Sequence, residues 1–347
     1  MIYLSGSILT KDGFIEGYAA LDDDIIAEIS EGRPPERPFA EGAVVPPLVN
    51  AHTHCADHGL GIPPGLSIGD AVAPPDGLKH TYLRTVSDDI LKENIRSYSD
   101  ISRNNGIGRF IDFREGGVKG CSLLRSASLD AVILGRPVSK EYDSNEIADI
   151  LGIADGIGLP SISDMDPKYI EKVADQTRSS GKIFAIHASE RIREDIDAIL
   201  SLDPAFIVHM LEATDGDISK CAETEVPIVV CPTSNGYFGK IPPIKRMMDC
   251  GADVAIGTDN AMFCAPDLRS EASLFKKILV SQGGDPEDVW KPFLRTGRNL
   301  LYSQREMYLN AGDPADVTVL PYRDVLTADS VLDSRERVTA LGKRGDR

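Results

Sequence analysis

The hydrophobic positions of this chain fall into short apolar runs that alternate with segments of helical periodicity. The apolar runs predict strands at 109–113, 131–134, 156–159, 183–186, 206–208, 228–230 and 254–256, after an earlier run that ends near residue 54. The intervening segments predict helices near 121–129, 145–153, 167–178, 194–200, 218–223 and 244–250, followed by 268–281 and 286–302.

This rhythm predicts the fold class. Strands that are apolar on both faces are expected in a parallel sheet that is covered on both sides. Eight such strands, each followed by a helix, predict a (β/α)₈ or TIM barrel, in which the active site lies at the C-terminal ends of the strands. A doubly wound open sheet is the alternative, but no Gly-x-Gly-x-x-Gly follows the first strand to support it.

The two ends of the chain have a different pattern. Residues 1–45 and 311–347 contain short strands and tight turns, which predicts a small composite β-sandwich domain beside a barrel domain at 46–310. Between residues 55 and 87, Gly and Pro are frequent and periodicity is weak, which predicts a long functional loop. A helix over 88–105 follows, with Ser87 as its N-cap.

Composition excludes several classes of protein. The 347 residues carry 37 basic and 54 acidic side chains, a net charge of −17, which argues against binding to nucleic acid or to an anionic membrane. No segment resembles a signal peptide or a bilayer-spanning helix. The six scattered cysteines are expected to be reduced thiols, so we predict a cytoplasmic protein.

Histidines and a carboxylate end several predicted strands. His52 and His54 lie two residues apart, so both side chains point to the same face of a strand. His187 and Asp259 end two later runs in the same manner. Three imidazoles and one carboxylate predict a site for a divalent metal, with Zn²⁺ preferred and Fe²⁺ or Mn²⁺ as alternatives.

Two further residues follow the same strand ends. His209 could be another ligand, or a group that polarises the substrate. Glu190 comes three residues after His187 and could transfer protons at the barrel rim, although an acid at a helix start would fit the same position.

Several motifs together resemble those of the amidohydrolase superfamily, within it the branch of cytosine deaminases, guanine deaminases and triazine hydrolases. The motifs are Pro47–His54, His187–Glu190, Val208–His209, Cys231–Asn235, Gly257–Asp259 and Gly312–Val317. The resemblance implies that His52, His54, His187 and Asp259 hold the metal. It also implies that Glu190 and His209 are catalytic.

The resemblance further implies a single metal ion. Binuclear relatives bridge two metals with a modified lysine at the end of strand four, whereas this strand ends Gly158-Leu159-Pro160. Asp259 would accept a proton from the attacking water and Glu190 would protonate the substrate.

The predicted activity is hydrolysis of a non-peptide C–N bond in a small molecule, with deamination of an amino-heterocycle as the leading interpretation. Hydrolysis of an amide or cyclic amide is the alternative, and a catalytically idle barrel that binds a metal or ligand is the alternative of another class. A homodimer is left open.

Residues that could contact the substrate are expected at the same rim. They are Lys79 and His80 in the long loop, Arg114 and Glu115 after strand two, Arg136 after strand three, and Asn235. The cations among them could receive an anionic group of the substrate, or could simply pair with nearby acids.

Overall fold

Parallel strands form a barrel at the centre of the computed structural model, which describes residues 1–63, 65–72, 76–302 and 304–342. Its strands are β5 (Leu48–His54), β6 (Ile107–Arg114), β7 (Ala131–Gly135), β8 (Gly156–Leu159), β9 (Ile183–Ala188), β10 (Phe206–His209), β11 (Ile228–Val230), β12 (Val254–Ile256) and β13 (Asp259–Asn260). Most of their residues are buried on both faces, as the apolar runs predict. The TIM-barrel fold is therefore confirmed.

The barrel closes through its last strand, which is interrupted once. β12 pairs with β11, and β13 pairs with β5, so the two ends of the sheet are the two halves of one strand. Only Gly257 and Thr258 separate these halves, and the amide of Thr258 donates to the carbonyl oxygen of His52 at 3.0 Å. The closure brings Asp259 beside the two histidines of β5.

A buried polar network joins β5 to the last strand. The Asn50 side-chain amide donates to Thr258 Oγ1 at 2.7 Å and to Tyr98 Oη at 3.1 Å. The Tyr98 hydroxyl also lies 2.8 Å from Thr53 Oγ1, whose own hydroxyl donates to the Asp259 carbonyl. Because a buried polar group without a partner is costly, this network favours one register at the seam.

Side chains fill the interior of the barrel below the strand ends. Phe113, Phe206 and Val208 belong to an apolar cluster contributed by strands around the ring. The Phe113 ring centroid lies 4.6 Å from that of His52 and 4.8 Å from that of His187. Phe113 thus forms an apolar floor beneath the histidines.

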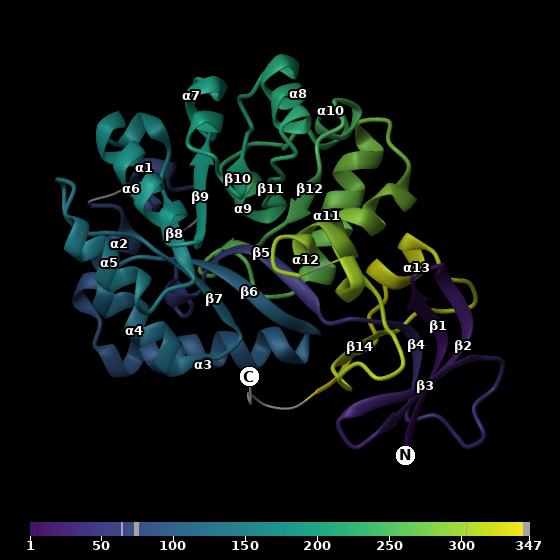
Figure 1. Ribbon diagram of the computed structural model, residues 1–347. Coiled ribbons are helices and arrows are strands. Elements are labelled where there is room, and N and C mark those ends of the chain that lie inside the picture. The colour runs from purple at the N-terminus through teal and green to yellow at the C-terminus, as the bar shows by residue number, and fades with distance from the viewer. Residues whose placement is uncertain (64, 73–75, 303, 343–347) are drawn as a thin grey trace.

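Helices cover the outside of the barrel (Figure 1). They are α3 (Asp88–Asn104), α4 (Gly117–Ala127), α5 (Ser144–Leu151), α6 (Pro167–Ser179), α7 (Ile196–Ser201), α8 (Asp215–Glu223), α9 (Pro232–Tyr237), α10 (Ile244–Asp249), α11 (Leu268–Ser281) and α12 (Gly297–Asn299). Side-chain caps such as Ser87, Asp143 and Asp166 begin several of them. None of the helices in the described ranges is long and apolar enough to cross a membrane.

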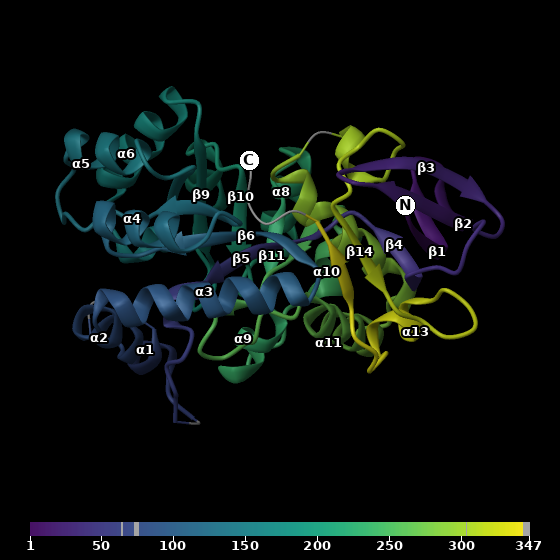
Figure 2. The ribbon, with the colours of Figure 1, turned by 90° about the horizontal axis from the view of Figure 1, so that it is seen from below.

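Strands from both ends of the chain form a separate sheet at one side of the barrel (Figure 2). They are β1 (Ile2–Thr10), β2 (Gly13–Asp22), β3 (Ile25–Glu31), β4 (Ala40–Val45), β14 (Val317–Leu320) and β15 (Thr339–Leu341), and α13 (Ala328–Leu332) lies between the last two in sequence. In the described residues these strands make one sheet of order β15-β14-β4-β1-β2-β3, so the predicted β-sandwich is not confirmed. The domain boundaries stay a prediction, and residues 343–347 lie outside the described residues.

Two local predictions differ from the structure. The segment 55–87 holds two short helices, α1 (Ile68–Ala71) and α2 (Leu78–Thr85), which are too short to give a clear period. The predicted helix 286–302 is broken into a 3₁₀ turn at Pro286–Val289, a π turn at Pro292–Thr296 and α12. Pro292 has no amide hydrogen, so it cannot continue a regular α-helical ladder.

Candidate active site

The predicted metal ligands meet at one point at the C-terminal ends of the strands. His52 and His54 come from β5, His187 from β9 and Asp259 from β13, and all four side chains are buried. His52 Nε2 lies 3.3 Å from His187 Nε2 and 3.3 Å from Asp259 Oδ1. His54 Nε2 lies 3.6 Å from the same carboxylate oxygen.

These spacings fit a tetrahedral metal site. Ligand nitrogens about 2.0–2.1 Å from Zn²⁺ in tetrahedral geometry are roughly 3.3–3.4 Å apart. The observed separation of the two Nε2 atoms, 3.3 Å, agrees with that value. The ligand atoms of His52, His54 and His187 all lie within 4.8 Å of one another, and so do those of His52, His209 and Asp259.

Hydrogen bonds orient two of the imidazoles toward this point. His187 Nδ1 lies 2.8 Å from the Leu159 carbonyl oxygen, and His54 Nδ1 lies 2.9 Å from the Phe113 carbonyl oxygen. A carbonyl only accepts, so each Nδ1 donates and each Nε2 presents a lone pair. Backbone acceptors of this kind commonly fix metal-binding histidines.

The charge states also suit a cation. Burial lowers the pKa of His52 to about 3, although Asp259 opposes the shift. Burial and the neighbouring imidazoles hold the pKa of His187 well below its ordinary value. For Asp259, burial would raise the pKa, but His52 and the other histidines outweigh it and keep the carboxylate ionised. Neutral imidazoles and one carboxylate are the forms that bind a divalent metal.

Backbone strain accompanies the site. His209 has φ 81° and Asp259 has φ 60°, and Ser189, which follows the His187 strand, has φ 47°. Residues other than Gly rarely adopt this left-handed backbone conformation, and those that do cluster at functional sites. The strain turns the chain sharply where these strands end.

The second oxygen of Asp259 has its own partner, which sequence reasoning missed. Ser234 Oγ, on α9, donates to Asp259 Oδ2 at 2.6 Å, and Asn260 Nδ2 donates to Oδ1 at 3.0 Å. Oδ1 is therefore the oxygen that faces the histidines. Oδ2 keeps a further lone pair that can take a proton.

Glu190 and His209 lie next to each other in the wall of the cavity. Glu190 Oε1 lies 3.7 Å from His209 Nε2, and the Glu190 side chain is 18% exposed, whereas that of His209 is 2% exposed. Asn235 Nδ2 lies 3.4 Å from His209 Nδ1, so Asn235 contacts this imidazole and is not part of the cavity lining.

Glu194, a residue that the sequence pattern did not single out, holds the loop that carries Glu190. Its carboxylate accepts from the amides of Ser189 at 2.7 Å and Ser163 at 2.8 Å. The Glu194 amide donates back to Ser189 Oγ at 3.1 Å. This reciprocal bonding fixes the loop after β9, and with it the position of Glu190.

The predicted substrate-binding residues divide into two groups. Lys79 and Arg136 line the same cavity as Glu190 and His209. Glu115 lies behind them, where it contacts Lys79 Nζ at 2.6 Å and His54 Nδ1 at 3.0 Å. Burial would raise the pKa of Glu115, but Lys79 and His54 outweigh it and hold the pKa well below its usual range.

Arg114 and His80, two of the candidates, do not line this cavity. Arg114 Nε donates to the Gly120 carbonyl at 3.1 Å, which holds its side chain against α4. His80 Nε2 lies 3.0 Å from the Val72 carbonyl oxygen, and burial, helped by Lys79, lowers the pKa of His80 to about 4. Both residues therefore support neighbouring backbone in this structure.

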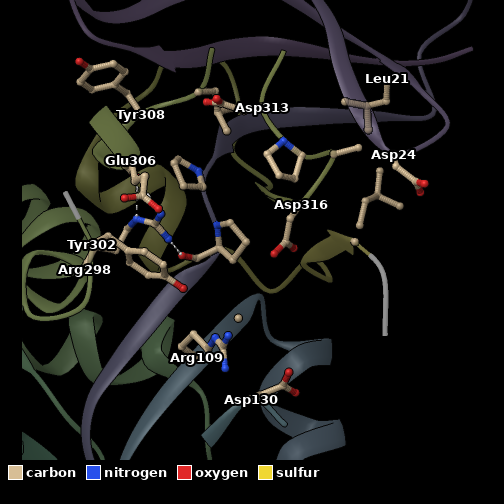
Figure 3. A pocket seen from close by; sticks show the side chains of 18 of the residues that line it. Leu21, Asp24, Arg109, Asp130, Arg298, Tyr302, Glu306, Tyr308, Asp313 and Asp316 are labelled. Atoms are coloured by element: carbon tan, nitrogen blue, oxygen red, sulfur yellow. Dashed lines mark hydrogen bonds between the residues drawn. The ribbon is translucent and has the colours of Figure 1, made fainter. Parts of the chain in front are cut away.

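A larger cavity, of about 940 Å³, lies at the opposite end of the barrel (Figure 3). Arg109 and Asp130 of the barrel face Asp24, Asp313 and Asp316 of the terminal segments across it. It opens beside the N-terminal ends of β6 and β7, whereas TIM-barrel chemistry takes place at the C-terminal ends. The histidine cavity is therefore the candidate active site.

Comparison with known proteins places this site in a family. No family model matches the chain. An uncharacterized protein of Methanocaldococcus jannaschii is 31% identical over 98% of this chain and 92% of its own length. A putative aminohydrolase of Methanothermobacter thermautotrophicus is 33% identical over 74% of each chain. A 5-methylthioadenosine/S-adenosylhomocysteine deaminase of Haloarcula marismortui is 23% identical over 75% of this chain and 69% of its own.

A solved structure agrees with the fold. The atrazine chlorohydrolase of Arthrobacter aurescens, complexed with zinc, superposes with a TM-score of 0.74 at 15% identity, over 99% of this chain and 96% of its own. Fold and relatives together define a hydrolase built on a TIM barrel. The chain belongs to the amidohydrolase superfamily, as its motifs indicate.

Proposed function

We propose that this enzyme uses a divalent metal to deaminate an amino-heterocycle of the purine, pyrimidine, pterin or nucleoside type. The observation that carries the proposal is the convergence of three histidines, Asp259 and Glu190 on one cavity. Relatives named as aminohydrolases and deaminases support the reaction class.

The proposed ligands are His52, His54, His187 and Asp259, and they would hold one ion, preferably Zn²⁺. Such an ion supplies Lewis acidity, which lowers the pKa of a water from near 16 toward roughly 7. No lysine lies at the end of β8, which supports a single ion.

The side chains of this chain would then move the protons. Asp259 Oδ2 accepts a proton as the water oxygen bonds to the amino-bearing carbon, while Glu190 donates a proton to the adjacent ring nitrogen. His209, whose imidazole lies next to Glu190, would stabilise the charge that develops on the adduct. The proton on Asp259 then passes to the amino group, the C–N bond breaks and ammonia leaves. As the ring carbonyl forms, the proton of the adduct's hydroxyl group returns to Glu190, so both carboxyl groups regain their starting states.

An ammonia-release screen tests this function. Purified protein loaded with Zn²⁺ is assayed against purines, pyrimidines, pterins and nucleosides, each paired with the analogue that lacks the amino group. Release of ammonia from at least one aminated compound, with the matching carbonyl product, is expected. Turnover only of amides or cyclic amides, without ammonia from any amino-heterocycle, would favour the amide-hydrolase alternative instead.

Metal analysis tests the proposed ligand set. After extensive dialysis, we expect about one tightly bound equivalent of divalent metal per chain, because four ligands converge on one point. His187→Ala should lose most of that metal, whereas His58→Ala should keep it, since His58 Nε2 lies 3.4 Å from Ser97 Oγ and His58 is not one of the converging ligands. Two tightly held equivalents in the unaltered protein would contradict a mononuclear site.

The cysteines support a reducing, cytoplasmic location. All six are free thiols in the structure, and five of them are buried. Buried thiols of this kind behave as small apolar side chains.

A further inference from the structure

One cation of the active-site cavity, Arg136, has no partner among the residues that the structure describes. Arg136 is the first residue after β7, where its backbone amide donates to the Arg114 carbonyl at 2.8 Å. In the part of the chain that the structure describes, its guanidinium takes part in no hydrogen bond or ion pair, and its Nε atom is buried without a partner. A guanidinium normally presents five donors in a planar fork.

The other cations of the cavity are already neutralised. Lys79 pairs with Glu115 at 2.6 Å, and Arg191 pairs with Asp164. Burial lowers the pKa of Arg136, and Glu115 and Asp164 only partly oppose that shift. Because a guanidinium stays protonated, the cavity retains a half-buried positive charge that no carboxylate of the described residues contacts, and leaving such a charge unpaired is costly.

We propose that Arg136 forms a subsite for an anionic group of the substrate, a carboxylate or a phosphate. This inference rests on the proposed function and narrows its substrate to an amino-heterocycle that carries an anionic substituent. Both anions match the two-point geometry of a guanidinium.

The placement of Arg136 fixes where that substituent lies. Arg136 follows β7, whereas the proposed proton donor Glu190 and His209 follow β9 and β10. β8 separates β7 from β9 in the sheet order. The anionic group would therefore lie on the β7 side of the cavity, separated by β8 from the strands that carry Glu190 and His209, with Lys79 lining the same cavity.

Binding measurements test the subsite without turnover. Calorimetry on the Zn²⁺-loaded protein compares lumazine-6-carboxylate with lumazine, and inosine monophosphate with inosine, none of which carries an amino group to release. At least one anionic member should bind more tightly than its neutral partner. The carboxylate pair and the phosphate pair distinguish the two kinds of anion.

Variants locate the effect at Arg136. Arg136→Met should weaken binding of the preferred anionic ligand about 10–100-fold, the worth of a charge-assisted two-point contact, and leave its neutral partner within about threefold. Lys140→Met removes an exposed cation from the same loop and should leave the binding of both the anionic ligand and its neutral partner unchanged. Arg136→Lys keeps the positive charge but loses the two-point geometry of the guanidinium, so it should bind the anionic ligand more tightly than Arg136→Met and more weakly than the unaltered protein. If Arg136→Met does not fold, Arg136→Lys replaces it in the comparison.

Turnover of the matching aminated pairs separates this inference from the proposed function. These pairs are pterin-6-carboxylate with pterin, and adenosine monophosphate with adenosine. If neither anionic probe binds better than its neutral partner, or if Arg136→Met weakens both alike, the anion subsite is overturned even where ammonia is released. If the anionic probes bind through Arg136 but no aminated compound reacts, the subsite stands and deamination fails.

Discussion

Asp259→Asn is expected to keep the fold and the bound metal but to lose turnover by about 10²–10⁴-fold, the usual worth of general acid–base catalysis. The side-chain amide of Asn can still present an oxygen at the Oδ1 position, which lies 3.3 Å from His52 Nε2. At the Oδ2 position, however, an amide nitrogen would replace the oxygen that now accepts from Ser234 at 2.6 Å. The nitrogen has no lone pair to accept the proton of the attacking water.

The measurement is the steady-state rate on the best substrate of the ammonia screen, with metal content determined on the same sample. Asp215→Asn makes the same chemical change on the surface at the start of α8 and should leave the rate unchanged. A rate near that of the unaltered protein in a metal-replete Asp259→Asn sample would remove Asp259 from its role as base. Loss of the metal would instead show that the carboxylate charge is needed to hold the ion.

The barrel was predictable from the sequence because its signal is local and repeated. β8, β11 and β12 have the bounds that their apolar runs predicted, and so does α11. Each of these strands is buried on both faces, so its apolar composition is nearly uninterrupted. The convergence of His52, His54, His187 and Asp259 follows from the same pattern, because the C-terminal ends of parallel strands meet at one rim.

The polar contacts that support the barrel seam and the site could not be predicted in this way, because they join residues far apart in sequence. Asn50 bonds to Thr258 across 208 positions, and no periodicity marks either residue as a partner. Ser234 could be noticed only as part of a motif, since its bond to Asp259 depends on how α9 packs. Glu194 looks like an ordinary acid before a helix, and only the fold shows that it holds the Glu190 loop.

The small sheet shows a related limit. Strand propensity at both ends of the chain predicted β structure, but strand pairing is set by long-range hydrogen bonds. β4 pairs in parallel with β1 and antiparallel with β14, so the two chain ends share one sheet. The amide of Ile26 also donates to the Asp313 carbonyl at 2.8 Å, which brings the β3 edge back toward the segment before β14.

Glu190→Gln is expected to have the second large effect on turnover. The size of the effect tells whether Glu190 carries a proton in the reaction or is an ordinary surface acid. Glu190 is partly exposed, lines the cavity, and approaches His209 Nε2 at 3.7 Å. Glutamine keeps the size and the hydrogen-bonding capacity of this side chain but has no acidic proton to deliver to a ring nitrogen.

We therefore expect the metal to stay bound and kcat to fall by about 10²–10⁴-fold on an amino-heterocycle. Glu212→Gln is the matched control, since Glu212 is 43% exposed at the same rim and pairs with Lys240 outside the cavity. An acid that served only the start of a helix would contribute about 0.3–1 kcal/mol, and its replacement would barely change the rate. If Glu190→Gln deaminates as fast as Glu212→Gln, the proposed mechanism loses its proton donor, and another acid of the cavity must supply the proton.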